Sequence, residues 1–234
     1  MKCPEDCQCF HDQNWSANVV QCSDRNLSKV PSLVPMDATA LHLNGNNLTR
    51  LKQDMFLGRA RLKSIVIERS NVMDIVNGTF SELNHLQKLH LGYNHLRQLF
   101  GQEFEGADSL IELHLHHNRL VTIAPDTFKH LSQLTHLRLD GNLLIEFPIW
   151  VLRSNPQLHS LRLSSNWWDC QCKFYRKFRM FIDTLGAGKV VKDANQITCN
   201  SNSDWRQDQE DENNCHSSSG EKESYTNGEF SIVI

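Results

Sequence analysis

The chain has 234 residues, a net charge of −3 and a sequence pI near 6.4. This length suits one large domain or two small ones. A slightly acidic chain with no basic tail or stripe has no general attraction for nucleic acid, so nucleic acid is a poor default partner.

Residues 1–37 form a cysteine-rich N-terminal segment. Met1 and Lys2 lead directly into Cys3, so we expect no signal peptide here and a natural N-terminus elsewhere. Four residues have the spacing of the inward positions of a shortened repeat, and Pro31 ends that pattern: Val20, Cys22, Leu27 and Val30. We interpret the segment as a cap, because the open end of a repeat array exposes apolar core and strand edges.

Residues 38–168 repeat with a period of 24 residues, in five complete rows and a partial sixth. The rows begin at Ala38, Leu62, Leu86, Leu110, Leu134 and Leu158. Each opens on the pattern L-x-x-L-x-L-x-x-N-x-L, which is the pattern of the leucine-rich repeat. The sequence therefore predicts an α/β fold, a leucine-rich repeat solenoid or horseshoe, with one short parallel strand per row about 4.8 Å from the next.

Two further positions recur within the rows. The ninth is asparagine in five rows, where its amide can satisfy buried backbone groups after the strand: Asn46, Asn94, Asn118, Asn142 and Asn166. Ser70 replaces it in the second row and predicts a weaker rung. The nineteenth position predicts an apolar spine on the far side of the core, built by Phe56, Phe80, Phe104, Phe128 and Leu152.

The fifth position of the strand points outward on the predicted concave face. The residues there and nearby are our candidates for binding a partner: His42, His90, His114, His116, Arg138 and Arg162. His117, His136 and His159 lie close by on the same surface. We expect His90 and His114 to be about 5 Å apart, so that protonation of both below pH 6 would place like charges side by side. Metal binding and mere solvent exposure are the alternatives for this face.

Residues 169–215 are predicted to form a C-terminal cap. Asp169 can cap a helix that begins near Cys170 and ends at Gly186, and one apolar face of that helix would seal the array with Phe174, Phe178, Phe181 or Ile182, and Leu185. Its basic residues, from Lys173 to Arg179, are interpreted as a solvated face. Residues 216–234 have little to bury and predict a flexible tail. The chain holds no membrane span, and the final Ser231–Ile234 could belong to a spanning helix or to a tail.

The eight cysteines fall into two sets of four, one on each side of the array. Even sets at the open ends of a solenoid indicate disulfide-bonded caps in an oxidising compartment. Zinc is the alternative, since C-x-C pairs can bind metal. Four glycosylation sequons favour the extracellular interpretation, at Asn14, Asn26, Asn47 and Asn77.

No motif indicates catalysis. The chain has no G-x-S-x-G elbow, no H-E-x-x-H and no phosphate-binding loop, and its carboxylates are scattered over repeat surfaces. We therefore predict a protein that is not an enzyme, with no catalytic residue, no cofactor and no metal.

The N-terminal segment resembles a specific family. CPEDCQCFHD at 3–12, WSANVV at 15–20, Cys22-Ser23, VPMD at 34–37 and LGR at 57–59 are similar to the last cysteine-capped repeat block of invertebrate Toll receptors. The likeness extends from residue 3 to about 215. It implies crossed disulfides in each cap, Cys3 to Cys9 and Cys7 to Cys22, then Cys170 to Cys199 and Cys172 to Cys215. The residues alone leave three pairings per cap open.

Two functions remain open at this point. The resemblance implies the membrane-proximal part of the ectodomain of a single-pass Toll-type receptor, acting in innate immunity or development, with a downstream spanning helix and signalling domain. That part would bind a protein ligand or a receptor ectodomain and support receptor association through weak self-association. The alternative is a self-sufficient secreted or cell-adhesion protein that binds a partner in its concave face.

Overall fold

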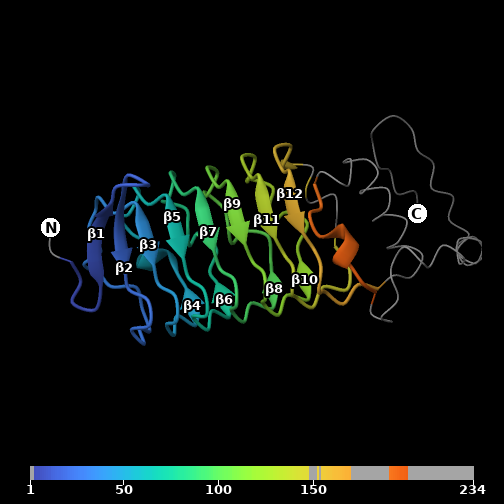
Figure 1. Ribbon diagram of the computed structural model, residues 1–234, viewed down its shortest axis with the longest axis horizontal. Coiled ribbons are helices and arrows are strands. Elements are labelled where there is room, and N and C mark those ends of the chain that lie inside the picture. The colour runs from blue at the N-terminus through green and yellow to red at the C-terminus, as the bar shows by residue number, and fades with distance from the viewer. Residues whose placement is uncertain (1–2, 148–151, 153, 170–189, 200–234) are drawn as a thin grey trace, which may run out of the picture.

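The computed structural model describes residues 3–147, 152, 154–169 and 190–199. Its coils stack side by side along one long axis, so that the N-terminal hairpin lies at one end and the last rows at the other (Figure 1). The predicted solenoid with one short strand per row is confirmed. In the described rows the segments between strands contain turns and a short 3₁₀ helix, η1 (Gln53–Met55).

One side of the solenoid is an eight-stranded sheet in the order β1-β2-β3-β5-β7-β9-β11-β12. Its strands are β1 (Gln8–Asp12), β2 (Ala17–Gln21), β3 (Ala40–His42), β5 (Ser64–Val66), β7 (Lys88–His90), β9 (Glu112–His114), β11 (His136–Arg138) and β12 (Ser160–Arg162). All neighbours pair in parallel except β1 and β2, which form an antiparallel hairpin.

Two smaller parallel pairs lie apart from this sheet, toward the lower edge of Figure 1. They are β4 (Arg50–Leu51) with β6 (Asp74–Ile75), and β8 (Gln98–Leu99) with β10 (Thr122–Ile123). Their apolar residues, such as Leu51 and Leu99, are buried. The first four rows are therefore closed around apolar side chains by strands on both sides.

The core follows from the repeat register. The strand centres lie opposite one another with every side chain fully buried, in the series Leu41, Ile65, Leu89, Leu113, Leu137 and Leu161. Burying one such side chain stabilises a fold by roughly 1.5–3 kcal/mol. The expected phenylalanine spine is confirmed, with ring centroids 5.8, 6.2 and 6.4 Å apart from Phe56 to Phe128.

The N-terminal hairpin closes the first end of the core. Val20 of β2 lies opposite Leu41 in parallel register, so the hairpin continues the sheet. Two disulfides tie it down, Cys3–Cys9 and Cys7–Cys22. These are the pairs that the resemblance implied. The antiparallel β1 ends the parallel stack, so the first repeat does not present an open apolar edge.

Residues 190–199 cover the other end of the described array. Val191 bridges Leu161 of β12, and the buried Asp193 carboxylate accepts hydrogen bonds from the backbone N–H groups of Leu163 and Ser164. A short 3₁₀ helix, η3 (Ala194–Gln196), follows Asp193. The buried Trp168 indole donates to the Leu163 carbonyl at 3.0 Å. Backbone groups of the last strand therefore find partners in the segment that covers it.

Several sequence predictions for this end lie outside the described residues. They are the helix predicted from Cys170 to Gly186, the residues Cys170, Cys172 and Cys215, and the tail at 216–234. Cys199 is disulfide-bonded. Over the part of the chain that the structure describes, no helix combines the length and the apolar character needed to cross a membrane.

Candidate functional site: the outer face of the sheet

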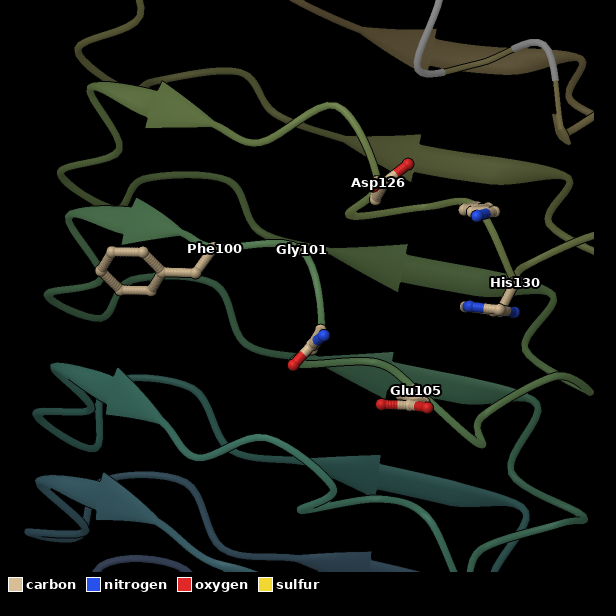
Figure 2. Close-up of a pocket in the computed structure, with 7 residues that line it drawn as sticks. Phe100, Gly101, Glu105, Asp126 and His130 are labelled. Atoms are coloured by element: carbon tan, nitrogen blue, oxygen red, sulfur yellow. The ribbon is translucent and has the colours of Figure 1, made fainter.

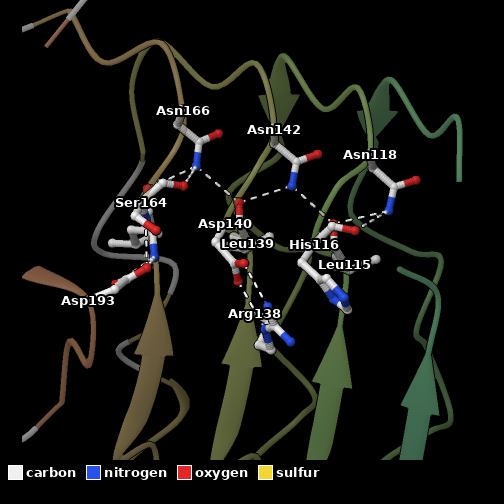
Figure 3. A network of polar contacts seen from close by, with 11 residues as sticks. Leu115, His116, Asn118, Arg138, Leu139, Asp140, Asn142, Ser164, Asn166 and Asp193 are labelled. Carbon is white, nitrogen blue, oxygen red and sulfur yellow. Dashed lines mark hydrogen bonds and ion pairs between the residues drawn. The ribbon is translucent and has the colours of Figure 1, made fainter. Parts of the chain in front are cut away.

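The ninth-position residues turn inward at one edge of the sheet and hold the rows together (Figure 3). The Asn118 amide donates to the carbonyls of Leu91 and Leu115 at 2.9 and 3.0 Å, and its oxygen accepts from the Leu96 N–H at 3.1 Å. Equivalent bonds are made by Asn46, Asn94, Asn142 and Asn166. These side chains are buried, so the structure gives them a structural role.

Ser70 makes part of the same pattern. Its hydroxyl lies 2.8 Å from the Leu43 carbonyl and 3.0 Å from the Glu68 carbonyl, and it accepts from the Asn46 N–H at 3.2 Å. A hydroxyl has one proton and can serve only one of these two carbonyls at a time. An asparagine amide carries two protons, so this rung holds fewer bonds.

The eighth position of every row has left-handed backbone, with φ between 50° and 70° at Gly45, Arg69, Tyr93, His117, Gly141 and Ser165. This turn places three side chains over the sheet as a stack. The Arg69 guanidinium lies 4.1 Å from the centre of the Tyr93 ring, and the Tyr93 ring stacks on His117 at 4.6 Å. The repeat pattern gave no signal for this stack, because non-glycine residues with positive φ cannot be identified from spacing.

The fifth-position histidines form a compact cluster with one carboxylate. The rings of His90 and His114 stack with centroids 4.0 Å apart, closer than the predicted 5 Å. Glu112 Oε1 lies 3.1 Å from His90 Nε2 and 2.9 Å from His114 Nε2, while its other oxygen is 3.5 Å from Lys88 Nζ. Glu112 stands at the third position of its row, and sequence reasoning did not single it out.

Burial sets the charge of this cluster. Burial and the adjacent His90 lower the pKa of His114 to about 3. Burial favours the neutral form of Glu112, but His114, His90 and Lys88 outweigh it and lower the pKa of this carboxyl. The expectation that both histidines become charged just below pH 6 is therefore wrong for His114, which stays neutral there.

His116 differs from the other partner-binding candidates because it is only 4% exposed. Its ring packs over Gly92, where an added Cβ would lie 2.4 Å from the ring. Burial and Arg138 lower its pKa to about 4, and its Nδ1 atom has no hydrogen-bond partner among the described residues. The structure thus buries a side chain that the sequence analysis placed on the binding surface.

The remaining candidates lie along the same face. The Arg138 guanidinium is held by Asp140 through bonds of 3.0 and 2.7 Å, and Arg162 of β12 is exposed. Burial favours neutral Asp140, but the hydrogen bonds from Arg138 outweigh it and lower the pKa of this carboxyl. His42 is half-buried and hydrogen-bonds Gln21 at 2.7 Å; burial and His90 lower its pKa.

All four sequon asparagines are exposed, and all lie in the N-terminal third of the chain: Asn14, Asn26, Asn47 and Asn77. The sheet face from β7 onward carries no sequon. Glycans at these positions would leave that part of the face open.

A small hollow lies on the side away from the eight-stranded sheet, between the third and fourth rows (Figure 2). It measures about 180 Å³ and is lined mainly by polar residues: Phe100, Gly101, Gln102, Glu105, Asp126, Lys129 and His130. Small-molecule sites usually measure about 300–1,000 Å³ and are mostly apolar. The sheet face is therefore the better candidate for function.

Comparison with known sequences matches two families. Residues 38–96, 84–144 and 108–167 match the leucine rich repeat, and residues 2–35 match the leucine rich repeat N-terminal domain. A stretch of 65 residues is 45% identical to Toll-like receptor 7 of Drosophila melanogaster, covering 28% of this chain and 4% of that protein. Leucine-rich repeat-containing protein 3 of Danio rerio is 31% identical over 96 residues, covering 41% of this chain and 35% of that protein.

Other relatives cover similar shares. Trophoblast glycoprotein of Macaca fascicularis is 32% identical over 110 residues, or 46% of this chain and 25% of that protein. Among solved structures, the crystal structure of the TLR13–ssRNA13 complex matches with a TM-score of 0.64 and 24% identity, over 71% of this chain and 24% of that chain. That likeness supports the fold. The chain spans no more than 35% of the length of these proteins.

Proposed function

We propose that this chain, which belongs to the leucine-rich repeat family, is a non-catalytic extracellular protein-binding module from the membrane-proximal ectodomain of a Toll-type signalling receptor at the plasma membrane. The cysteine-capped N-terminal block and the 65 residues that are 45% identical to a Toll-like receptor support the receptor assignment. The two N-terminal disulfides and the leucine rich repeat cap agree with an extracellular module. In such a receptor the module would support ligand-induced association.

The observation that carries the binding proposal is the ordered face of the sheet from β5 to β11. Arg69, Tyr93 and His117 form a preassembled stack there, and Tyr93 is 39% exposed. Tyrosine and arginine, like tryptophan, are enriched among the central residues that contribute most of the binding energy at protein interfaces. Because these side chains already hold one another in place, a partner that docks on them orders little further side-chain freedom.

A second candidate is a self-sufficient secreted or adhesion protein. It is favoured by the similarity to leucine-rich repeat-containing protein 3. That match covers 35% of the relative's length, whereas the Toll-like receptor 7 match covers 4% of the receptor's length. The sequence of the parent transcript beyond Ile234 separates the two. A spanning helix followed by a cytoplasmic signalling domain is expected for the receptor, and a stop codon without either would replace it with the secreted protein.

Competition tests the binding face. The soluble chain, added to cells that express the parent receptor, is expected to reduce ligand-dependent signalling. The variant Tyr93→Ala/His117→Ala should lose this effect, while Lys129→Ala on the opposite side should keep it. A double variant that competes as well as the unmodified chain would remove the sheet face from the interface.

A further inference from the structure

Two histidines and one carboxylate on the sheet face meet the distance requirements of a metal site. A ring nitrogen of His90, a ring nitrogen of His114 and a carboxylate oxygen of Glu68 all lie within 4.8 Å of one another. The histidine side chains are 22% and 16% exposed and Glu68 is 21% exposed, so the group is sheltered yet open on one side. Ligand atoms around one tetrahedral zinc ion are about 3.4 Å apart. Side-chain rotations that move these ligand atoms by about 1 Å would therefore bring them to the spacing that one zinc ion requires.

Glu112 supplies the second requirement of such a site. Its Oε1 atom hydrogen-bonds His90 Nε2 at 3.1 Å and lies 2.9 Å from His114 Nε2, so one carboxylate oxygen stands beside both rings. Histidines that bind metal usually donate their other ring N–H to a carboxylate, which fixes the ring orientation and makes the free nitrogen a better ligand. With both Nε2 atoms held by one carboxylate, the Nδ1 atoms remain to bind an ion. Imidazole is mainly neutral at pH 7, as a ligand must be.

We propose that His90, His114 and Glu68 bind one divalent transition-metal ion of the zinc or nickel type, and that Glu112 positions the two rings. Imidazole nitrogens favour zinc, nickel and copper, whereas calcium and magnesium require oxygen ligands. Three protein ligands leave a fourth position of the ion open to solvent or to an incoming group. The site is measured on the isolated chain, so it does not depend on the proposed receptor function.

The charges around the site decide how freely an ion enters. Lys88 lies 3.5 Å from Glu112 and Arg69 lies 4.0 Å from Glu68. Lys88 is 51% exposed and can turn into solvent when an ion binds, whereas the Arg69 guanidinium stays on the Tyr93 ring and reaches Glu68 only at 4.0 Å. Arg138 is already neutralised by Asp140. The neighbourhood therefore offers two carboxylates, and the lysine and arginine beside them contact them only at 3.5 and 4.0 Å.

Equilibrium dialysis and thermal unfolding of the chain, prepared without a polyhistidine tag, test this with zinc chloride and nickel chloride. We expect one ion per chain at pH 7.5 and a higher unfolding midpoint, because a ligand that binds only the folded state stabilises it. His114→Ala and Glu68→Ala should each weaken binding at least about 100-fold, and Glu112→Gln about 10–100-fold. In ¹⁵N NMR spectra, zinc should shift the Nδ1 resonances of His90 and His114.

A second histidine pair provides the matched control. His136 is the first residue of β11, and His159 directly precedes β12; their ring centroids are 4.9 Å apart. Their ring nitrogens contact Thr135 and Gln157 rather than a carboxylate. The variant His136→Ala/His159→Ala is expected to keep full binding. Absence of binding at 100 μM ion, equal loss in the control, or undiminished binding in a folded His114→Ala variant would each overturn the site. Binding by Glu112→Gln equal to that of the unmodified chain would overturn its positioning role.

Discussion

Asn118 lies at one edge of the eight-stranded sheet, and its side chain holds the third and fourth rows together. Replacing it with alanine leaves the carbonyls of Leu91 and Leu115 and the N–H of Leu96 without their buried partner. We expect Asn118→Ala to lower the free energy of unfolding by roughly 1–3 kcal/mol. Chemical denaturation measures this.

The control for that prediction is Asn84→Ala at an exposed position of the second row. Exposed substitutions without special contacts usually change stability by less than about 0.5 kcal/mol. If Asn118→Ala unfolds like the control, the ninth-position asparagines do not hold the rows and the ladder assignment is wrong.

Gly92 leaves room for the buried ring of His116. A methyl group on Gly92 would lie 2.4 Å from that ring, which has little space to move at 4% exposure. We expect Gly92→Ala to destabilise the fold by about 1–3 kcal/mol through overpacking. In a His116→Ala background the same change should have almost no effect. Thermal unfolding of the four proteins in this cycle measures the coupling, and additive effects would mean that the ring does not occupy this space.

The sequence could not place His116 correctly, and the reason is local. Alternation along a strand predicts that odd positions of these rows face outward, which holds for His90 and His114. His116 stands at the seventh position, where the strand has already ended. Gly92 stands at the same position one row earlier and has no side chain, so the His116 ring can pack down over it and become buried. A glycine at position seven followed 24 residues later by a large side chain is the signal that could have found it.

At the scale of elements, the strands and rows could be predicted, because the 24-residue period and the burial of the apolar strand positions both require the same pairing register. The five-row repeat without insertion fixes which residues lie side by side, and the strand pairings follow it. The antiparallel β1–β2 hairpin and the small pairs such as β4–β6 were not predicted, since two-residue strands leave no periodic signal. The Glu112 contact was also missed, because it depends on side-chain rotamers across two strands.

The two disulfides of the N-terminal cap should differ in how much each stabilises the chain. Cys7–Cys22 closes 15 residues and Cys3–Cys9 closes 6, and the entropy removed from the unfolded chain grows with loop length. We expect Cys7→Ala/Cys22→Ala to lose about 3 kcal/mol, and Cys3→Ala/Cys9→Ala about 2 kcal/mol. Calorimetry of the two variants measures both losses. A larger loss of stability in Cys3→Ala/Cys9→Ala than in Cys7→Ala/Cys22→Ala would mean that the shorter loop contributes more to the stability of the hairpin.

The pairing of the C-terminal cap remains a prediction of Cys170 with Cys199 and Cys172 with Cys215. Peptide mapping of the non-reduced protein identifies the linked fragments directly. The known N-terminal pairs serve as internal controls in the same digest. A bridge between the two caps, or Cys172 linked to Cys199, would contradict the crossed arrangement.

The whole molecule combines a long sheet face with a small apolar flank at its last rows. The flank is formed by neighbouring residues of the fifth and sixth rows that are 37%, 47% and 56% exposed, Leu143, Ile145 and Trp167. A two-fold pair must use the same patch on both chains. A stable dimer usually buries about 800 Å² on each partner, which is far more than three partly exposed side chains supply. Self-contact at this flank should therefore be weak.

We expect the chain to sediment as a monomer at micromolar concentration and to associate only in the high micromolar range or above. Weak contact is sufficient for a membrane receptor, because tethering supplies an effective concentration in the millimolar range. Sedimentation velocity from 5 to 500 μM measures the association. Trp167→Ala should abolish the residual association, while Phe100→Ala, which removes an even more exposed aromatic ring on the side away from the sheet, should not. A dimer already complete at 5 μM would require a larger interface than this flank, and would move self-contact to the sheet face that the proposed function assigns to another partner.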